Sequence, residues 1–244
     1  MYLADFSGKG VLIAVIDSGV HASHPHVGGV SGGITIREDG TLADEFVDRL
    51  GHGTAVTAAI RDIAPDAGIF AIKVFQQSLA TDVGTLVRAI DEAAGRGAAV
   101  INLSLGTAET SHRPVVEAAV SRALAHGAIV VSAHDDDGVR WLPGCLPGVV
   151  AVRADWTCER HSYTLADGDH GPLIVASAYP RDIPGVARER NVNGVSFAVA
   201  NAAGFVARAL EASPAATAAA VLARLGETCG SSLTREGERR IVRA

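Results

Sequence analysis

The sequence has no excess of basic residues, no long uncharged hydrophobic run and no closely paired cysteines. Its 244 residues include 21 Lys and Arg against 27 Asp and Glu, a formal net charge of -6 at pH 7. Because proteins bind a phosphate backbone through clustered basic charge, we expect no nucleic-acid partner. No segment combines membrane-spanning length with freedom from charge, so we also expect no membrane partner.

Targeting signals are also missing from the start of the sequence. The first ten residues contain neither a long apolar run nor a basic start that leads into one, which is the pattern of a secretory signal. We therefore expect a cytoplasmic protein. A signal or pro-segment that has been trimmed from the chain is the alternative.

Metal and disulfide frameworks find little support. The three cysteines are odd in number and widely spaced: Cys145, Cys158 and Cys229. This spacing argues against a disulfide framework and a zinc knuckle, and leaves one bond between Cys145 and Cys158 open. His21, His24 and His26 share one loop, but no carboxylate or cysteine ligand lies nearby in sequence. We expect no metal and no cofactor.

The chain alternates between apolar and Ala-rich segments. Apolar runs rich in β-branched residues cover 11–16, 68–74, 98–105, 128–133, 148–152 and 172–176. Ala-rich stretches with helical spacing cover 55–61, 82–94, 114–125 and 196–210. Near-continuous apolar strands are typical of a parallel sheet that is covered on both faces. The pattern predicts an α/β fold with a doubly wound, mostly parallel sheet and helices on both faces.

The length of the chain, its helix-capping residues and its loop-forming residues refine this prediction. No linker with a shift in composition divides the sequence, and 244 residues suit one domain, so we expect a single domain over 1–244. Thr81 or Asp82 can cap the second helix, and Ser213 followed by Pro214 can open a final helix. Gly, Pro and charged residues dominate 156–193, which we expect to form surface loops around one strand.

Three segments carry residues with catalytic chemistry. Asp17 ends the first apolar run, His52 stands between two glycines at the start of a helix, and Ser196 opens an Ala-rich helix. A helix N-terminus presents free N–H groups that favour an oxyanion. Each residue has a simpler explanation when taken alone, because aspartate and serine are common capping residues and G-H-G is a common turn.

Taken together, these segments resemble the subtilisin-like serine peptidases (subtilases, peptidase family S8). The shared motifs, in chain order, are D-S-G at 17–19, H-G-T at 52–54 and G-x-S-x-A at 194–198. The resemblance covers roughly residues 10–204. It implies a three-layer subtilisin-like fold and a serine endopeptidase with Asp17, His52 and Ser196 as its catalytic triad.

The resemblance also implies how a peptide would be bound. A substrate in extended form would contact Ser104, Leu105, Gly106, Ala133, His134 and Asp136. The oxyanion would be held by the backbone N–H of Ser196 and by a side chain at position 135, where the family normally has Asn. An ionised Asp135 accepts hydrogen bonds and donates none, so it would repel the oxyanion, whereas a protonated Asp135 could donate.

Two further features bear on substrate choice. His134 replaces a small glycine of the family at the wall of the S1 pocket, so we expect its imidazole to narrow that pocket. The acidic run 135–137 has two interpretations: it selects a basic residue at P1, or it is a solvated acidic turn. The turn is the commoner fate of charge runs and is favoured here.

Three functional hypotheses remain from the sequence. The first is a restricted processing protease that removes a leader or cleaves a precursor. The second is a catalytically impaired pseudoenzyme that serves as a peptide-binding module, because position 135 lacks the usual donor. The third is peptide ligation through the same acyl-enzyme, which the sequence does not separate from hydrolysis.

Overall fold

A mixed sheet forms the centre of the molecule. The computed structural model describes residues 2–228, 242 and 243. Within this part of the chain, ten strands pair in the order β12-β10-β11-β9-β6-β5-β1-β4-β2-β3. Their bounds are β1 Leu12–Asp17, β2 Gly32–Ile36, β3 Leu42–Ala43, β4 Gly68–Lys73, β5 Val100–Leu103, β6 Ile129–Ala133, β9 Val150–Asp155, β10 Ser162–Gly168, β11 Gly171–Ser177 and β12 Val242–Arg243. In this spatial order, neighbouring strands between β11 and β2 pair in parallel. The strands β3, β10 and β12 pair antiparallel with their neighbours.

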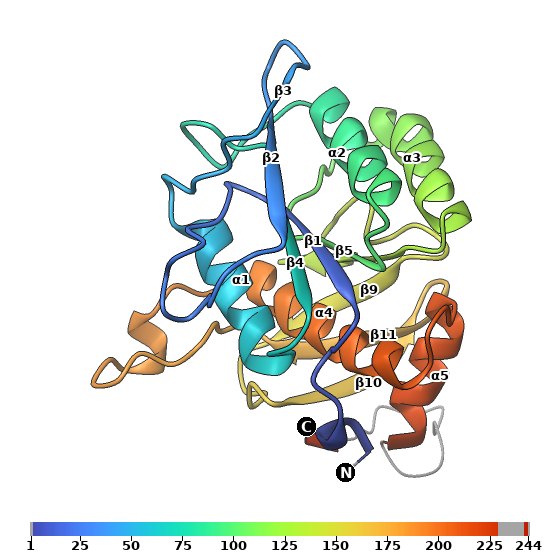
Figure 1. The fold of residues 1–244 in the computed structure, drawn as a ribbon. Coiled ribbons are helices and arrows are strands. Elements are labelled where there is room, and N and C mark those ends of the chain that lie inside the picture. The colour runs from blue at the N-terminus through green and yellow to red at the C-terminus, as the bar shows by residue number, and fades with distance from the viewer. Residues whose placement is uncertain (1, 229–241, 244) are drawn as a thin grey trace.

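Helices cover both faces of this sheet (Figure 1). They are α1 His52–Ile63, α2 Val83–Gly95, α3 Arg113–Ala125, α4 Val195–Ala212 and α5 Ala218–Thr228, with 3-10 turns at η1 Tyr2–Asp5, η2 Thr110–His112 and η3 Arg188–Arg190. Helices α1, α4 and α5 share one core with the sheet, and α2 and α3 share the other. The structure therefore confirms the predicted doubly wound fold.

Strand β1 explains why the apolar runs are continuous. Ile13 and Val15 belong to the core under α1 and α4, whereas Ala14 and Ile16 belong to the core under α2 and α3. All four are buried. A strand with two covered faces needs apolar residues at every position.

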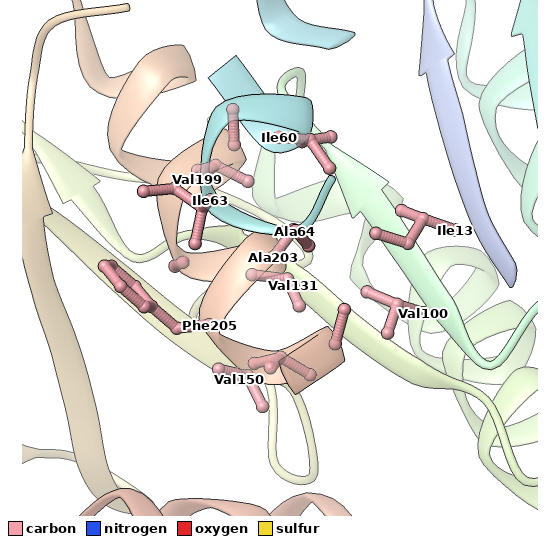
Figure 2. Close-up of a cluster of buried hydrophobic side chains, with 14 of the residues drawn as sticks. Ile13, Ile60, Ile63, Ala64, Val100, Val131, Val150, Val199, Ala203 and Phe205 are labelled. Atoms are coloured by element: carbon pink, nitrogen blue, oxygen red, sulfur yellow. The ribbon is translucent and has the colours of Figure 1, made fainter. Parts of the chain in front are cut away.

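The core under α4 depends on small residues. Figure 2 shows this cluster, with side chains from the strands and the two helices, including Ile13, Ile60, Ile63, Val131, Val199, Ala203 and Phe205. A Cβ at Gly204 would lie 2.6 Å from the Cβ of Ile63, so a larger residue there would push α1 from α4. By length and composition alone α4 could also cross a membrane, but 72% of that window is buried inside the protein.

The strand order also determines where a site can form. Strand β1 pairs with β4 on one side and with β5 on the other. Chain order reverses at this point, and ligands of open α/β sheets bind beyond the carboxyl ends of strands at such a switch. Asp17 is the last residue of β1, and Ser104 follows β5.

Two details differ from the sequence-based expectations, and one alternative that the sequence left open is decided. The region expected to hold one strand contains both β10 and β11, which form an antiparallel hairpin. Ser213 closes α4 instead of opening the final helix, which begins at Ala218. Cys145 and Cys158 are free thiols, and Cys229 lies outside the described residues. By contrast, Asp82 caps α2 as expected, accepting from the Thr85 N–H at 2.9 Å.

Candidate active site

Asp17 and His52 form a tight pair. The Asp17 carboxylate is fully buried, and its Oδ1 accepts from the backbone N–H of Ser18 at 2.7 Å. His52 Nδ1 lies 2.8 Å from Asp17 Oδ1 and 3.0 Å from Oδ2. Because an ionised carboxylate only accepts, Nδ1 carries the proton and donates it to Asp17. The other ring nitrogen, Nε2, is left as the basic one.

The glycines on either side of His52 bring its ring to Asp17. Gly51, at φ 86°, adopts a left-handed conformation that glycine accepts at little cost. A Cβ at Gly53 would lie 2.2 Å from the carbonyl oxygen of Gly19, so only glycine lets α1 approach β1 this closely. Helix α1 therefore begins at His52 with the imidazole beside the end of β1.

The environment makes His52 a stronger base. Its side chain is 18% exposed. Burial alone would lower the pKa of His52, but the hydrogen bond to Asp17 and the charges of Asp17 and Asp48 outweigh burial and raise it. His52 therefore holds a proton more readily than an ordinary imidazole does.

Asp48 is a functional residue that the sequence-based reasoning missed. Its Oδ1 accepts from Ser18 Oγ at 2.8 Å and from the N–H groups of Leu50 and Gly51, and its Oδ2 accepts from Thr54 N and Oγ1. Burial opposes ionisation, but these hydrogen bonds lower the pKa of Asp48. The carboxylate fixes the first turn of α1 against the end of β1. An acidic residue shortly before a helix start was the signal available.

Ser196 lies at the N-terminus of α4, near His52. The ring centroids of His52 and Phe197 are 5.8 Å apart, and Phe197 directly follows the serine. Ser196 Oγ donates to the carbonyl oxygen of Ser104 at 3.2 Å, and Ser104 Oγ donates back to the carbonyl of Ser196 at 3.2 Å. Within the described residues there is no hydrogen bond between Ser196 Oγ and His52. A rotation about χ1 of Ser196 is the movement that would turn Oγ toward Nε2.

A pocket of about 120 Å³ opens beside Ser196. It is lined by Ser104, Leu105, Gly106, Ala133, Asp136, Trp141, Val195, Ser196 and Val199. Most of the predicted substrate residues therefore meet at one place. Trp141 forms part of the pocket wall, one of two roles that its sequence allows, although packing in a loop or in the core is the commoner role of such an aromatic residue.

The backbone along this pocket offers unpaired groups. In the part of the chain that the structure describes, the N–H and C=O groups of Leu105 and Gly106 have no hydrogen-bond partner. The next residue, Thr107, exchanges two backbone bonds of 2.9 Å with Leu142. Leu105 and Gly106 thus present a short free edge of the kind that accepts an added strand.

His134 lies away from this pocket. His134 is buried, and its ring nitrogens face two carboxylates: Nδ1 lies 2.5 Å from Asp135 Oδ1, and Nε2 lies 3.1 Å from Asp169 Oδ2. Its side chain lines a different cavity of about 380 Å³. The expectation that the imidazole narrows the pocket beside Ser196 is therefore corrected: the turn between β10 and β11, which carries Asp169, holds His134 elsewhere.

Asp135 is held in its ionised form. Its Oδ1 accepts from Arg153 Nε at 3.0 Å as well as from His134. Burial alone would raise the pKa of Asp135, but the His134 and Arg153 hydrogen bonds and charges outweigh it and lower the pKa. These contacts favour the ionised form of Asp135 over the protonated form that could donate to an oxyanion.

Comparison with known proteins identifies the family. The model of the subtilase family, peptidase S8, matches residues 8–242. This chain belongs to the subtilase family. Subtilisin E of Bacillus subtilis (strain 168) is 30% identical over 241 residues, which cover 91% of this chain and 61% of subtilisin E. The chain thus spans less than two thirds of the length of that relative.

Two solved protease structures share the fold. The prenylagaramide maturation protease PagA superposes with a TM-score of 0.64 at 25% identity, covering 86% of this chain and 79% of the other. A lanthipeptide protease superposes with a TM-score of 0.72 at 20% identity, covering 95% and 84%.

Two of the three histidines in the loop 21–26 contact each other. His24 Nδ1 accepts from the N–H of His26 at 3.2 Å, and the two rings meet edge to face with their centroids 5.2 Å apart. Over the described residues, no group of three His, Cys, Asp or Glu side chains is arranged to hold a metal ion.

Proposed function

We propose that this subtilase domain is a serine endopeptidase in which Asp17, His52 and Ser196 form the catalytic triad. One observation carries the proposal: a buried carboxylate holds Nδ1 of a histidine that lies next to the N-terminus of α4, where Ser196 stands. The family motifs at these three positions support it. The raised pKa of His52 also supports a role as general base.

The reaction follows from these groups. His52 Nε2 takes the proton of Ser196 Oγ as the oxygen attacks the peptide carbonyl carbon and the carbonyl oxygen gains the electron pair. Asp17 stabilises the imidazolium that forms and keeps its own charge. His52 then gives the proton to the leaving amine as the C–N bond breaks, which leaves an acyl-enzyme on Ser196. His52 next takes a proton from the water that attacks this ester, and the acid product and the Ser196 hydroxyl are released. The N–H groups at the start of α4 stabilise the oxyanion.

The substrate class we propose is an extended peptide, cleaved at few sites. The free backbone groups of Leu105 and Gly106 suit main-chain pairing with such a peptide. The ionised Asp135 offers no second oxyanion donor, which favours slow cleavage of a dedicated precursor over bulk digestion. The similarity to a maturation protease and a lanthipeptide protease also supports cleavage of a dedicated precursor.

A peptide-binding module without catalysis is the second candidate. Two observations favour it: Asp135 is ionised, and the Ser196 hydroxyl donates to the carbonyl of Ser104 instead of to His52. Such a protein would bind the same extended peptides along Leu105 and Gly106 but would not form an acyl-enzyme.

Labelling with a fluorophosphonate distinguishes the two candidates. This reagent phosphonylates only a serine that a neighbouring base activates. We expect labelling of the wild-type protein and of Ser111→Ala, an exposed serine in η2, and none of Ser196→Ala. Absence of labelling in the wild-type protein from pH 6 to pH 9 would contradict the peptidase and favour the binding module.

A further inference from the structure

Three consecutive aspartates occupy one small hairpin but have different surroundings. The hairpin pairs β7 (Asp135–Asp136) with β8 (Val139–Arg140). Asp135 pairs with Arg153 and lies within hydrogen-bond distance of His134. Asp137 is exposed at the turn, with a left-handed φ of 47°. Only Asp136 lines the pocket beside Ser196.

Asp136 carries a charge that nothing in the described chain neutralises. The residue is half-buried, and its carboxylate has neither a hydrogen bond nor an ion pair among the described residues. Burial raises the pKa of Asp136, and the charges of Asp137 and Asp135 raise it further. A half-buried carboxylate without a partner is costly, because the desolvated charge is not compensated.

The basic residues of the hairpin and of β9 beside it already have carboxylate partners. Arg140 of the same hairpin pairs with Asp169, and Arg153 of β9 pairs with Asp135. His134, the other basic group next to the hairpin, lies between Asp135 and Asp169. A positive charge for Asp136 therefore has to come from outside this network.

The rest of the pocket suits a long cationic side chain. Leu105, Val195 and Val199 provide an apolar wall for a methylene stem, and Trp141 provides an aromatic ring. Lysine and arginine commonly bury the stem along apolar surface and direct the charged end to a carboxylate or to an aromatic face. Ser196, at the mouth of the same pocket, is the nucleophile proposed above.

We propose that Asp136 selects lysine or arginine at P1, the residue whose carbonyl group Ser196 attacks. This inference rests on the proposed peptidase function. It assigns Asp136 to substrate recognition. Of the run 135–137, only Asp137 then fits the interpretation as a solvated acidic turn.

The test uses peptidyl diphenyl phosphonates, which react with an active serine and carry a chosen P1 side chain. Lysine is compared with norleucine, which keeps the carbon chain without the charge, and arginine with citrulline. We expect the wild-type protein to react about tenfold or more faster with each cationic probe, the scale of one charge-assisted hydrogen bond in a half-buried site. In Asp136→Asn the ratio falls close to one.

Asp137→Asn is the matched control. It removes the same charge one residue away, and asparagine accepts the left-handed conformation of that position. The lysine-to-norleucine ratio should stay high in this variant. In the wild-type protein the ratio should also fall at low pH as Asp136 is protonated, and it should do so at a higher pH than for an ordinary aspartate. The titration of His52 affects both probes equally, so it cancels from the ratio.

The outcomes separate this inference from the proposed function. Fluorophosphonate labelling of Ser196 with a cationic-to-neutral ratio near one overturns the role of Asp136 and leaves the peptidase intact. An equal loss of the ratio in Asp136→Asn and Asp137→Asn also overturns it, because the effect would then be one of general charge. No fluorophosphonate labelling at all overturns the peptidase, and the assignment of P1 with it.

Discussion

The molecule holds two histidine–carboxylate groups at the carboxyl edge of its sheet, one around buried Asp17 and one around buried His134, and they differ in one respect. His52 presents Nδ1 to Asp17, and its Nε2 has no partner among the described residues. His134 presents Nδ1 to Asp135 and Nε2 to Asp169, so both nitrogens are engaged. A carboxylate turns an imidazole into a useful base only when the second nitrogen is free to accept a proton.

The largest expected effect comes from replacing each of the two histidines in a separate variant. We predict that His52→Ala lowers kcat by about 10³-fold or more, the scale of lost general acid–base catalysis. His134→Gln should lower it less than about tenfold, because His134 moves no proton in the reaction. Steady-state kinetics on one cleavable peptide measures both. Equal losses in the two variants would remove the distinction between the pairs.

Asp135 gives an effect in the opposite direction. Asp135→Asn places a neutral amide donor at the position where the family has one, and we predict a gain of about tenfold in kcat. In subtilisin itself the corresponding donor contributes roughly 10²–10³, which makes this a modest expectation. Asp135→Ala removes the charge without adding a donor and should gain less. A lower rate in Asp135→Asn would show that the ionised carboxylate is required.

The sequence contained enough to predict the first pair but not the second. Asp17, His52 and Ser196 stand in short motifs that resemble those of the subtilases, and this resemblance predicted the Asp17–His52 pair. The place of His134 depends on Asp169, 35 residues later, in a turn that belongs to the β10–β11 hairpin. That hairpin was itself missed, because β10 has a mixed pattern in which buried Ser162, Tyr163 and Thr164 replace an apolar run.

A smaller effect concerns the pH dependence set by Asp48. Activity requires neutral His52, so kcat/KM should rise with pH through a pKa above the ordinary histidine value. The Asp48 charge helps to raise that pKa, so Asp48→Asn should move the acidic limb of the profile to lower pH. Glu45→Gln, a charge loss on the same segment without contact to α1, is the control. An acidic limb that moves to higher pH in Asp48→Asn would contradict the account.

The smallest expected effect on activity comes from a third, surface pair, His161 with Asp62. The hydrogen bond to His161, opposed by burial and aided by the charges of Arg160 and Arg181, lowers the pKa of Asp62 to about 2. A lowered acid pKa stabilises the fold above the unfolded value, and this contribution is lost as the pH falls toward 2. We predict that Asp62→Asn lowers the free energy of unfolding by about 1–2 kcal/mol at pH 7, with kcat unchanged.

Denaturant unfolding of the Asp62→Asn variant between pH 7 and pH 2 checks this. The difference from the wild-type protein should shrink below about pH 4. Asp91→Asn, which breaks the exposed Asp91–Arg122 pair, should cost less than about 1 kcal/mol. A difference for Asp62→Asn that does not change with pH would mean that packing, and not charge, is responsible.

The central claim is that His52, through its free nitrogen, activates Ser196. Mass spectrometry of the protein after reaction with a fluorophosphonate tests it at the level of the residue. The account predicts one phosphonyl adduct, on Ser196, which persists in His134→Gln and disappears in His52→Ala. An unmodified Ser196, or an adduct that forms equally fast in His52→Ala, would contradict it.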